Sequence, residues 1–66
     1  MEKSRSEIEF LIDEYILSER DRKLLKRRLI DGIIYEKLAE EFNLSERQVK
    51  NIVYNSQDKI FKKVNL

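Results

Sequence analysis

The 66-residue sequence predicts an all-α fold, a small domain of four helices, on three observations. The chain has one glycine and no proline, so few residues interrupt a helix. Glu, Lys, Leu and Arg, which favour helices, are abundant. Apolar residues recur at intervals of three and four, the spacing of one helical face. We expect residues 1–66 to form a single domain, with no wing beside its helices.

The first expected helix is amphipathic and lies within residues 1–17. It begins at Ser4 or Ser6, because each is followed three residues later by a glutamate, as in a capping box. Its main apolar face contains Ile8, Leu11, Ile12 and Tyr15. Phe10 and Leu17 lie on the opposite side, seven residues apart. Either they are exposed, as single hydrophobic residues often are, or they contact a second subunit.

Residues 18–64 are expected to form a core of three further helices. Ser18 caps the second helix, which we expect to stop at Gly32, because glycine readily adopts the left-handed conformation that ends helices. The third helix starts at residue 34 or 35 and ends at Phe42. Asn43 follows, and asparagine is the residue that next best tolerates the left-handed conformation.

Ser45 and Gln48 form another capping box, which opens the fourth helix. No breaker follows, so we expect this helix to reach Lys62 or Lys63. Its core-facing stripe contains Val49, Ile52, Val53, Ile60 and Val64. The turn before it spans only residues 43–45, which favours a steep crossing of the third and fourth helices.

Composition limits the function classes. Hydrophobic and charged residues each make up 41% of the chain, and no run approaches the ~20 apolar residues that span a bilayer. No signal-peptide core follows the N-terminus. We expect a soluble, cytoplasmic protein that does not contact membranes. Because cysteine and histidine are absent, we expect no metal, no cofactor and no enzymatic activity.

The net charge of +1 conceals segments of opposite sign. Residues 1–19 carry six acidic and two basic groups, whereas residues 20–34 carry six basic and two acidic groups. Arg20, Arg22 and Lys23, at the start of the second helix, are candidate contacts for DNA phosphates. The alternative is that the basic run pairs with the acidic first helix or with the third helix.

From Tyr35 to Tyr54 the sequence resembles the helix-turn-helix of DNA-binding proteins. Leu38, Phe42, Leu44, Val49 and Ile52 match the apolar positions of that pattern. Ala39 matches its small residue, which lets two helices approach closely. Asn43 replaces the usual turn glycine and tolerates the same backbone angles.

The wider segment SERDRKLLKRRLIDGIIYEKLAEEFNLSERQVKNIVYNSQDKI is similar to sigma factor region 4, to LuxR-type DNA-binding domains and to sigma-like phage activators of late transcription. The resemblance is carried by Arg20, Leu25, Gly32, YEKLA (35–39), Ser45 and VKN (49–51). It implies a sequence-specific transcriptional regulator that binds double-stranded DNA. The recognition helix would be the one that starts at Ser45.

The outward stripe of the fourth helix fits this role. It contains Arg47, Lys50, Asn51, Tyr54 and Asn55. The major groove admits one helix, and arginine and asparagine pair well with guanine and adenine edges. We expect Arg47, Gln48 and Asn51 near the bases, because the N-terminal part of a recognition helix penetrates deepest. We expect Lys50, Tyr54 and Asn55 to contact either phosphates or bases.

Two further residues stand at the start of this helix. We expect Ser45, with the helix N-terminus, to receive a phosphate oxygen. Glu46 either accepts a hydrogen bond from a cytosine amino group or only favours the helix N-terminus. The alternative for the whole stripe is an ordinary solvated helix face.

We also expect a homodimer, because so small a core gains from a partner and two modules read a longer site. Phe10 and Leu17 are the expected dimer contacts. The alternative function keeps the fold and changes the partner. In that case the domain binds RNA polymerase or another regulator through its acidic first helix.

Overall fold

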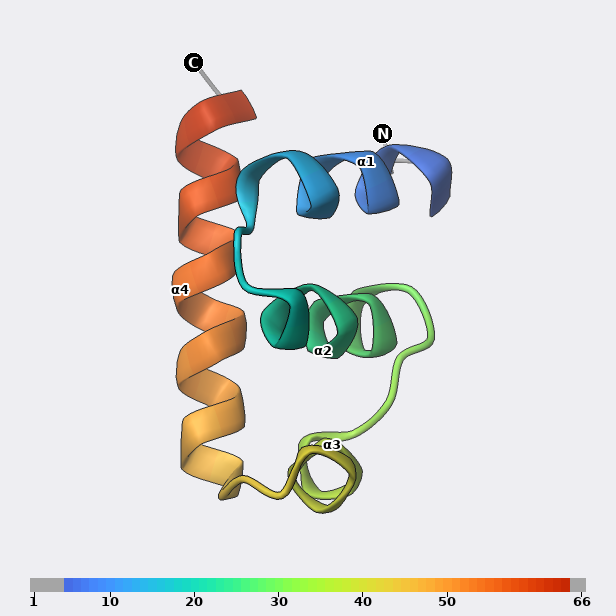
Figure 1. Ribbon diagram of the computed structural model, residues 1–66, viewed down its shortest axis with the longest axis vertical. Coiled ribbons are helices and arrows are strands. Elements are labelled where there is room, and N and C mark those ends of the chain that lie inside the picture. Colours follow the sequence, from blue (N-terminus) through green and yellow to red (C-terminus); the bar gives the residue numbers. More distant parts are fainter. Residues whose placement is uncertain (1–4, 65–66) are drawn as a thin grey trace.

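The computed structural model describes residues 5–64, with side chains described as far as Lys62. It contains the helices α1 (Arg5–Tyr15), α2 (Glu19–Leu29), α3 (Tyr35–Phe42) and α4 (Glu46–Val64), and no strand lies within the described residues. Figure 1 shows α1, α2 and α3 stacked along one side of the long α4. The predicted all-α, four-helix fold is therefore confirmed.

The junction between α1 and α2 differs slightly from the prediction. Because α1 begins at Arg5, Ser6 is inside the helix and does not start it, while Ser4 lies outside the described residues. The helix ends at Tyr15, so Leu17 belongs to the linker. Ser18 caps α2 as predicted: the backbone N–H of Asp21 donates to the Ser18 hydroxyl oxygen at 3.3 Å.

The end of α2 corrects the role predicted for Gly32. Gly32 does adopt a left-handed conformation, with φ of 71°. However, α2 already ends at Leu29, and Ile30 caps it in a right-handed conformation. The backbone N–H groups of Ile30 and Asp31 both donate to the Lys26 carbonyl, at 3.0 and 3.3 Å. The regular hydrogen-bond pattern of α2 therefore ends where two N–H groups share the Lys26 carbonyl, and the chain changes direction at Gly32.

The boundaries of α3 and α4 follow the local signals closely. Asn43 adopts φ of 56° and ψ of 47°, the predicted left-handed conformation. The capping box is present, because Gln48 N–H donates to Ser45 Oγ at 3.1 Å and Ser45 N–H donates to Gln48 Oε1 at 2.9 Å. At its other end α4 continues to Val64, one residue beyond the predicted limit.

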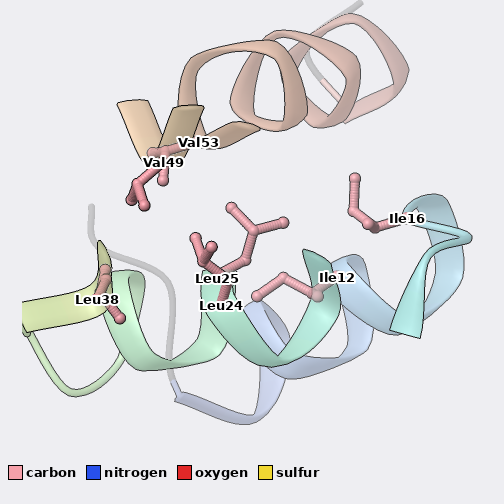
Figure 2. Close-up of a cluster of buried hydrophobic side chains, with 7 residues drawn as sticks. All are labelled: Ile12, Ile16, Leu24, Leu25, Leu38, Val49 and Val53. Carbon is pink, nitrogen blue, oxygen red and sulfur yellow. The ribbon is translucent and has the colours of Figure 1, made fainter. Parts of the chain in front are cut away.

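One apolar core joins all four helices. Its buried hydrophobic residues are Ile12, Ile16, Leu24, Leu25, Leu38, Val49 and Val53, and Figure 2 shows their side chains converging. Burying a side chain of this kind contributes about 1.5–3 kcal/mol relative to leaving it exposed. Because α1 supplies Ile12, this helix belongs to the same core as the three later helices.

Ion pairs add ties across this core. Arg27 of α2 makes a two-pronged contact with Glu41 of α3, with its Nε donating to Oε1 at 3.1 Å and its NH2 group to Oε2. Arg27 also pairs with Asp31 at 3.5 Å, and Asp31 pairs with Arg5 of α1 at 3.6 Å. The hydrogen bond from Arg27 lowers the pKa of the Glu41 carboxyl below 4.5, and the same bond raises the pKa of Arg27.

The lowered pKa of Glu41 predicts a component of stability that depends on pH. Because the folded pKa is depressed, this component is fully present above the unfolded value and is lost as pH falls through the folded pKa. The Glu41→Gln chain is expected to be less stable at neutral pH and to lose less of its free energy of unfolding on acidification. Urea unfolding from about pH 7 to about pH 3 measures this.

Glu40→Gln is the matched control, because Glu40 is the neighbouring exposed glutamate and makes no ion pair with a described residue. Its pH profile should follow that of the original chain. Identical profiles for the two variants would show that the contact with Arg27 is not responsible.

Candidate nucleic-acid interface

The turn between α3 and α4 sets the direction in which α4 projects. Asn43 turns the chain by its left-handed backbone, and the N–H of Leu44 donates to the Ala39 carbonyl at 2.9 Å. The two helices then cross steeply: in Figure 1 α3 is seen nearly end-on, whereas α4 is seen from the side and runs vertically. Leu38 of α3 and Val49 of α4 are fully buried on the sides of the two helices that face the core. The structure thus has two helices, α3 and α4, that are joined by a short turn and packed against each other.

The predicted stripe of α4 lies on the surface. Arg47, Lys50, Asn51, Tyr54 and Asn55 are all exposed. The opposite side of the helix carries Val49 and Val53, which are at most 1% exposed. Tyr54 keeps 55% of its surface open to solvent. The first turns of α4 therefore present an uncovered polar surface, which we call the α4 stripe.

Three side chains of the α4 stripe lack an internal partner. Arg47, Asn51 and Asn55 make no side-chain hydrogen bond, ion pair or ring contact with another residue of the described chain. Arg47 and Asn51 are four residues apart, so their side chains are neighbours on one helical face. Their donors and acceptors are available to a ligand without breaking an interaction within the fold.

The capping residues are less available than the sequence implied. Ser45 Oγ accepts from the Gln48 backbone N–H, and the Gln48 side-chain oxygen Oε1 accepts from the Ser45 backbone N–H. The amide N–H groups of Gln48 make no hydrogen bond within the described residues, whereas its Oε1 is already bound to the Ser45 N–H. Glu46 is exposed in the first turn, where a negative charge favours the helix N-terminus.

An aromatic and cationic cluster adjoins the α4 stripe. The rings of Tyr54 and Tyr35 pack edge to face, with centroids 6.5 Å apart. The Arg28 guanidinium lies 4.2 Å from the Tyr35 ring centroid, and the Lys50 ammonium lies 5.7 Å from it. Hydrogen bonding with the Tyr35 side chain, reinforced by its charge, raises the pKa of Tyr54. Tyr54 therefore has a packing role within the fold.

Tyr35 and Arg28 were missed as neighbours of this surface. Tyr35 is half-buried and packs against the apolar core. No signal in α3 alone places its ring beside Tyr54, which lies nineteen positions later. The one sequence feature consistent with this contact is that the third helix begins with a tyrosine and the polar face of the fourth helix also carries one.

The basic run of α2 is largely used within the fold. Lys26 pairs with Asp13 of α1 at 2.9 Å. Arg27 binds Glu41 of α3, and Arg28 donates to the Ile33 carbonyl at 3.0 Å. The basic run was expected either to contact DNA phosphates or to pair with the first or third helix, and Lys26 and Arg27 do pair with these helices.

The three proposed phosphate contacts of α2 differ from one another. Arg22 donates from Nε to the Ile16 carbonyl at 2.6 Å and from NH2 to the Leu17 carbonyl at 3.1 Å. It thereby satisfies backbone oxygens just after α1 ends. Arg20 pairs with its neighbour Asp21, and Lys23 pairs with Glu19 one turn away. Both remain exposed, so these two are better placed than Arg22 to meet a ligand.

Comparison of the chain with protein-family models, curated proteins and solved structures finds no match. Within residues 5–64, no helix is both long enough and apolar enough to cross a membrane. In the same part of the chain, no group of three or more acidic side chains is placed to hold a metal ion.

The contacts of Arg22 predict a structural role. Arg22→Ala removes two charged hydrogen bonds to main-chain oxygens, so the free energy of unfolding should fall by about 1.5–3 kcal/mol. Lys23→Ala, which breaks only an exposed ion pair, should change it by less than about 1 kcal/mol. Urea denaturation of both variants measures the difference. Equal stability of the two variants would contradict the assignment.

Proposed function

We propose that this chain is a sequence-specific DNA-binding regulator of transcription that places the first turns of α4 in the major groove. One contrast supports the proposal best. All six cations of α2 have a partner within the fold, whereas Arg47, Asn51 and Asn55 on the α4 stripe have none among the described residues. Polar groups held outward and unpaired on a rigid helix are suited to binding another molecule.

The chemistry of the α4 stripe favours a duplex over other polar ligands. The arginine guanidinium matches O6 and N7 of guanine, and the asparagine amide matches N6 and N7 of adenine. Arg47 and Asn51 are one turn apart near the start of α4, the part of a recognition helix that reaches the bases. In this proposal Asn55 and the amide of Gln48 extend the contacts along the groove.

Phosphate contacts would position the helix without specifying sequence. Lys50 and Tyr54 belong to the α4 stripe, and both contact the Tyr35 ring. Ser45 and the adjoining N–H groups stand at the positive end of the α4 dipole. Arg20 and Lys23 of α2 are the remaining candidates. Arg22 is left out, because its donors are bound to the carbonyls after α1.

The proposal includes a homodimer that acts in the cytoplasm, where it meets DNA. A single module of this kind covers about 600–1,000 Å² of protein surface on DNA, and a second copy doubles the length of sequence that is read. A two-fold dimer would then favour a two-fold symmetric site.

A second candidate function is contact with RNA polymerase or another regulator. The observation that favours it is α1, which has four acidic groups against one basic group and leaves Phe10 62% exposed. Capture of a protein partner that survives high salt, together with no DNA binding at low salt, would favour this function over the first.

The proposal predicts the effect of removing base-reading groups. After a preferred site is selected from random duplexes, Arg47→Ala or Asn51→Ala should each weaken binding to it by about 1–3 kcal/mol and relax base preference at one position. Fluorescence anisotropy at fixed salt, with the selected and a scrambled duplex, measures both effects.

Arg47→Lys is the matched control, because it keeps the charge and loses the two-pronged donor geometry. It should retain affinity for the scrambled duplex while losing preference for the selected one. Lys50→Ala should instead weaken both duplexes alike and lower the slope of log affinity against log salt by about one. Equal affinity of the original chain for every duplex would refute base reading.

A further inference from the structure

The six cations of α2 differ in the partner that each has within the fold. Four of them pair with a carboxylate of the described chain: Arg20, Lys23, Lys26 and Arg27. The polar partners of Arg22 and Arg28 are instead backbone carbonyls, which carry no net charge. Arg22 uses its Nε and its NH2 group in this way, whereas Arg28 uses only NH1. Arg28 therefore keeps a charge that no described carboxylate neutralises, and it keeps further N–H donors.

The guanidinium of Arg28 is held from two directions. Its NH1 group donates to the Ile33 carbonyl at 3.0 Å, and its Cζ lies over the Tyr35 ring, 4.2 Å from the centroid. An arginine that packs on an aromatic ring still presents the N–H groups at the edge of its plane, which suit the oxygens of a phosphate. Arg28 therefore offers its remaining donors from a position that the fold sets.

Lys50 of α4 brings a second cation to the same ring. Its ammonium lies 5.7 Å from the Tyr35 ring centroid, and it makes no ion pair with a described residue. Two positive charges thus lie beside one tyrosine, and neither is paired with a carboxylate in the part of the chain that the structure describes. Such a pair creates a local positive potential that attracts an anion.

Tyr54 completes this group. Its ring packs edge to face on Tyr35, with centroids 6.5 Å apart. Hydrogen bonding with Tyr35 raises the pKa of Tyr54 and the charge of Arg28 acts in the opposite direction, so the guanidinium lies within electrostatic reach of the Tyr54 hydroxyl. Residues of α2, α3 and α4 therefore meet here, and we call them the Tyr35 cluster: Arg28, Tyr35, Lys50 and Tyr54.

The Tyr35 cluster adjoins one edge of the α4 stripe. The helical period puts Lys50 at that edge and Asn55 at the other, with Arg47 and Asn51 between them. A phosphate strand borders the major groove on each side, so a helix that reads bases with the middle of its polar face meets phosphates at the edges of that face. The cluster therefore lies where the proposed docking of α4 would bring a phosphate.

We infer that the Tyr35 cluster binds one phosphate group, which in the proposed function belongs to the backbone of the duplex. The free N–H groups of Arg28 and the ammonium of Lys50 donate to the phosphate oxygens, while the Tyr35 ring supports both cations. The inference rests on the proposed function and deepens it, because it adds Arg28 of α2 to the residues that position α4 on DNA.

Titration with inorganic phosphate tests the site in the absence of DNA. Proton–nitrogen NMR spectra, with chloride keeping the ionic strength constant, should show saturable shifts of the Arg28 Nε–H signal and of amides in the Tyr35 cluster. Arg28→Gln and Lys50→Gln should each weaken phosphate binding by about fivefold or more, because each removes a charged hydrogen-bond donor. Circular dichroism verifies that both variants are folded, and Lys50 is exposed, so its replacement leaves the core intact.

Lys59→Gln is the matched control. Lys59 is an exposed cation of the same helix, makes no ion pair with a described residue and lies nine positions beyond Lys50. Its replacement removes the same charge outside the cluster and should leave phosphate binding unchanged.

Uncharged phosphates locate the contact on DNA. The phosphates of the selected duplex are replaced one at a time by methylphosphonates, and fluorescence anisotropy measures the affinity. At one position the replacement should weaken binding of the original chain and of Lys59→Gln but cost Arg28→Gln much less, because that variant has already lost the contact. Arg28→Gln should also lower the slope of log affinity against log salt by about one on selected and scrambled duplexes alike.

Two results would overturn the inference. One is inorganic phosphate that shifts no signal of the Tyr35 cluster, or that binds Arg28→Gln and Lys50→Gln as well as the original chain. The other is a duplex that the original chain binds, but in which no methylphosphonate distinguishes Arg28→Gln from it. Phosphate binding at the cluster without affinity for any duplex would instead overturn the DNA-binding proposal, so the two failures are distinguishable.

Discussion

Packing of α2 against α4 is the interaction on which the rest of the structure depends. In the described chain α1 and α3 are not packed against each other, and each is held by both α2 and α4. Leu24 and Leu25 of α2 and Val53 of α4, all at most 1% exposed, form the centre of that contact (Figure 2). Because the core is so small, weakening this contact would loosen α1 and α3 together.

This arrangement gives α4 two ends with different surroundings. At its start, α3 and the short turn cover only one side, so the α4 stripe faces solvent. Toward its end, α1 packs against it, and Leu11 and Phe61 line a hollow beside the two helices. The same long helix therefore has an exposed polar surface near its start and an apolar hollow beside its later turns. The rigid core between them fixes their separation.

The two sets of cations follow from the same packing. Since α2 lies between its neighbours, its long basic side chains reach oxygens on both sides, as Lys26 does with Asp13 and Arg27 with Glu41. The outward side of α4 faces no other helix, and Arg47 has no carboxylate of the described chain within reach. Basic residues of similar appearance in the sequence therefore differ in their availability to a ligand, and the difference lies in which helix carries them.

The sequence by itself determined the helices and the orientation of the α4 stripe. Ser18, Asn43 and the Ser45–Gln48 pair act through contacts within a few residues of the chain, so their roles can be read from local spacing. The helical period likewise places Asn51 opposite Val49 and Val53. Only the tertiary structure decided that Arg22 is bound within the fold, that Tyr35 meets Tyr54, and that Leu11 and Phe61 line one hollow. These contacts join different helices or a helix to a linker, and their existence depends on how the packed core sets one element against another.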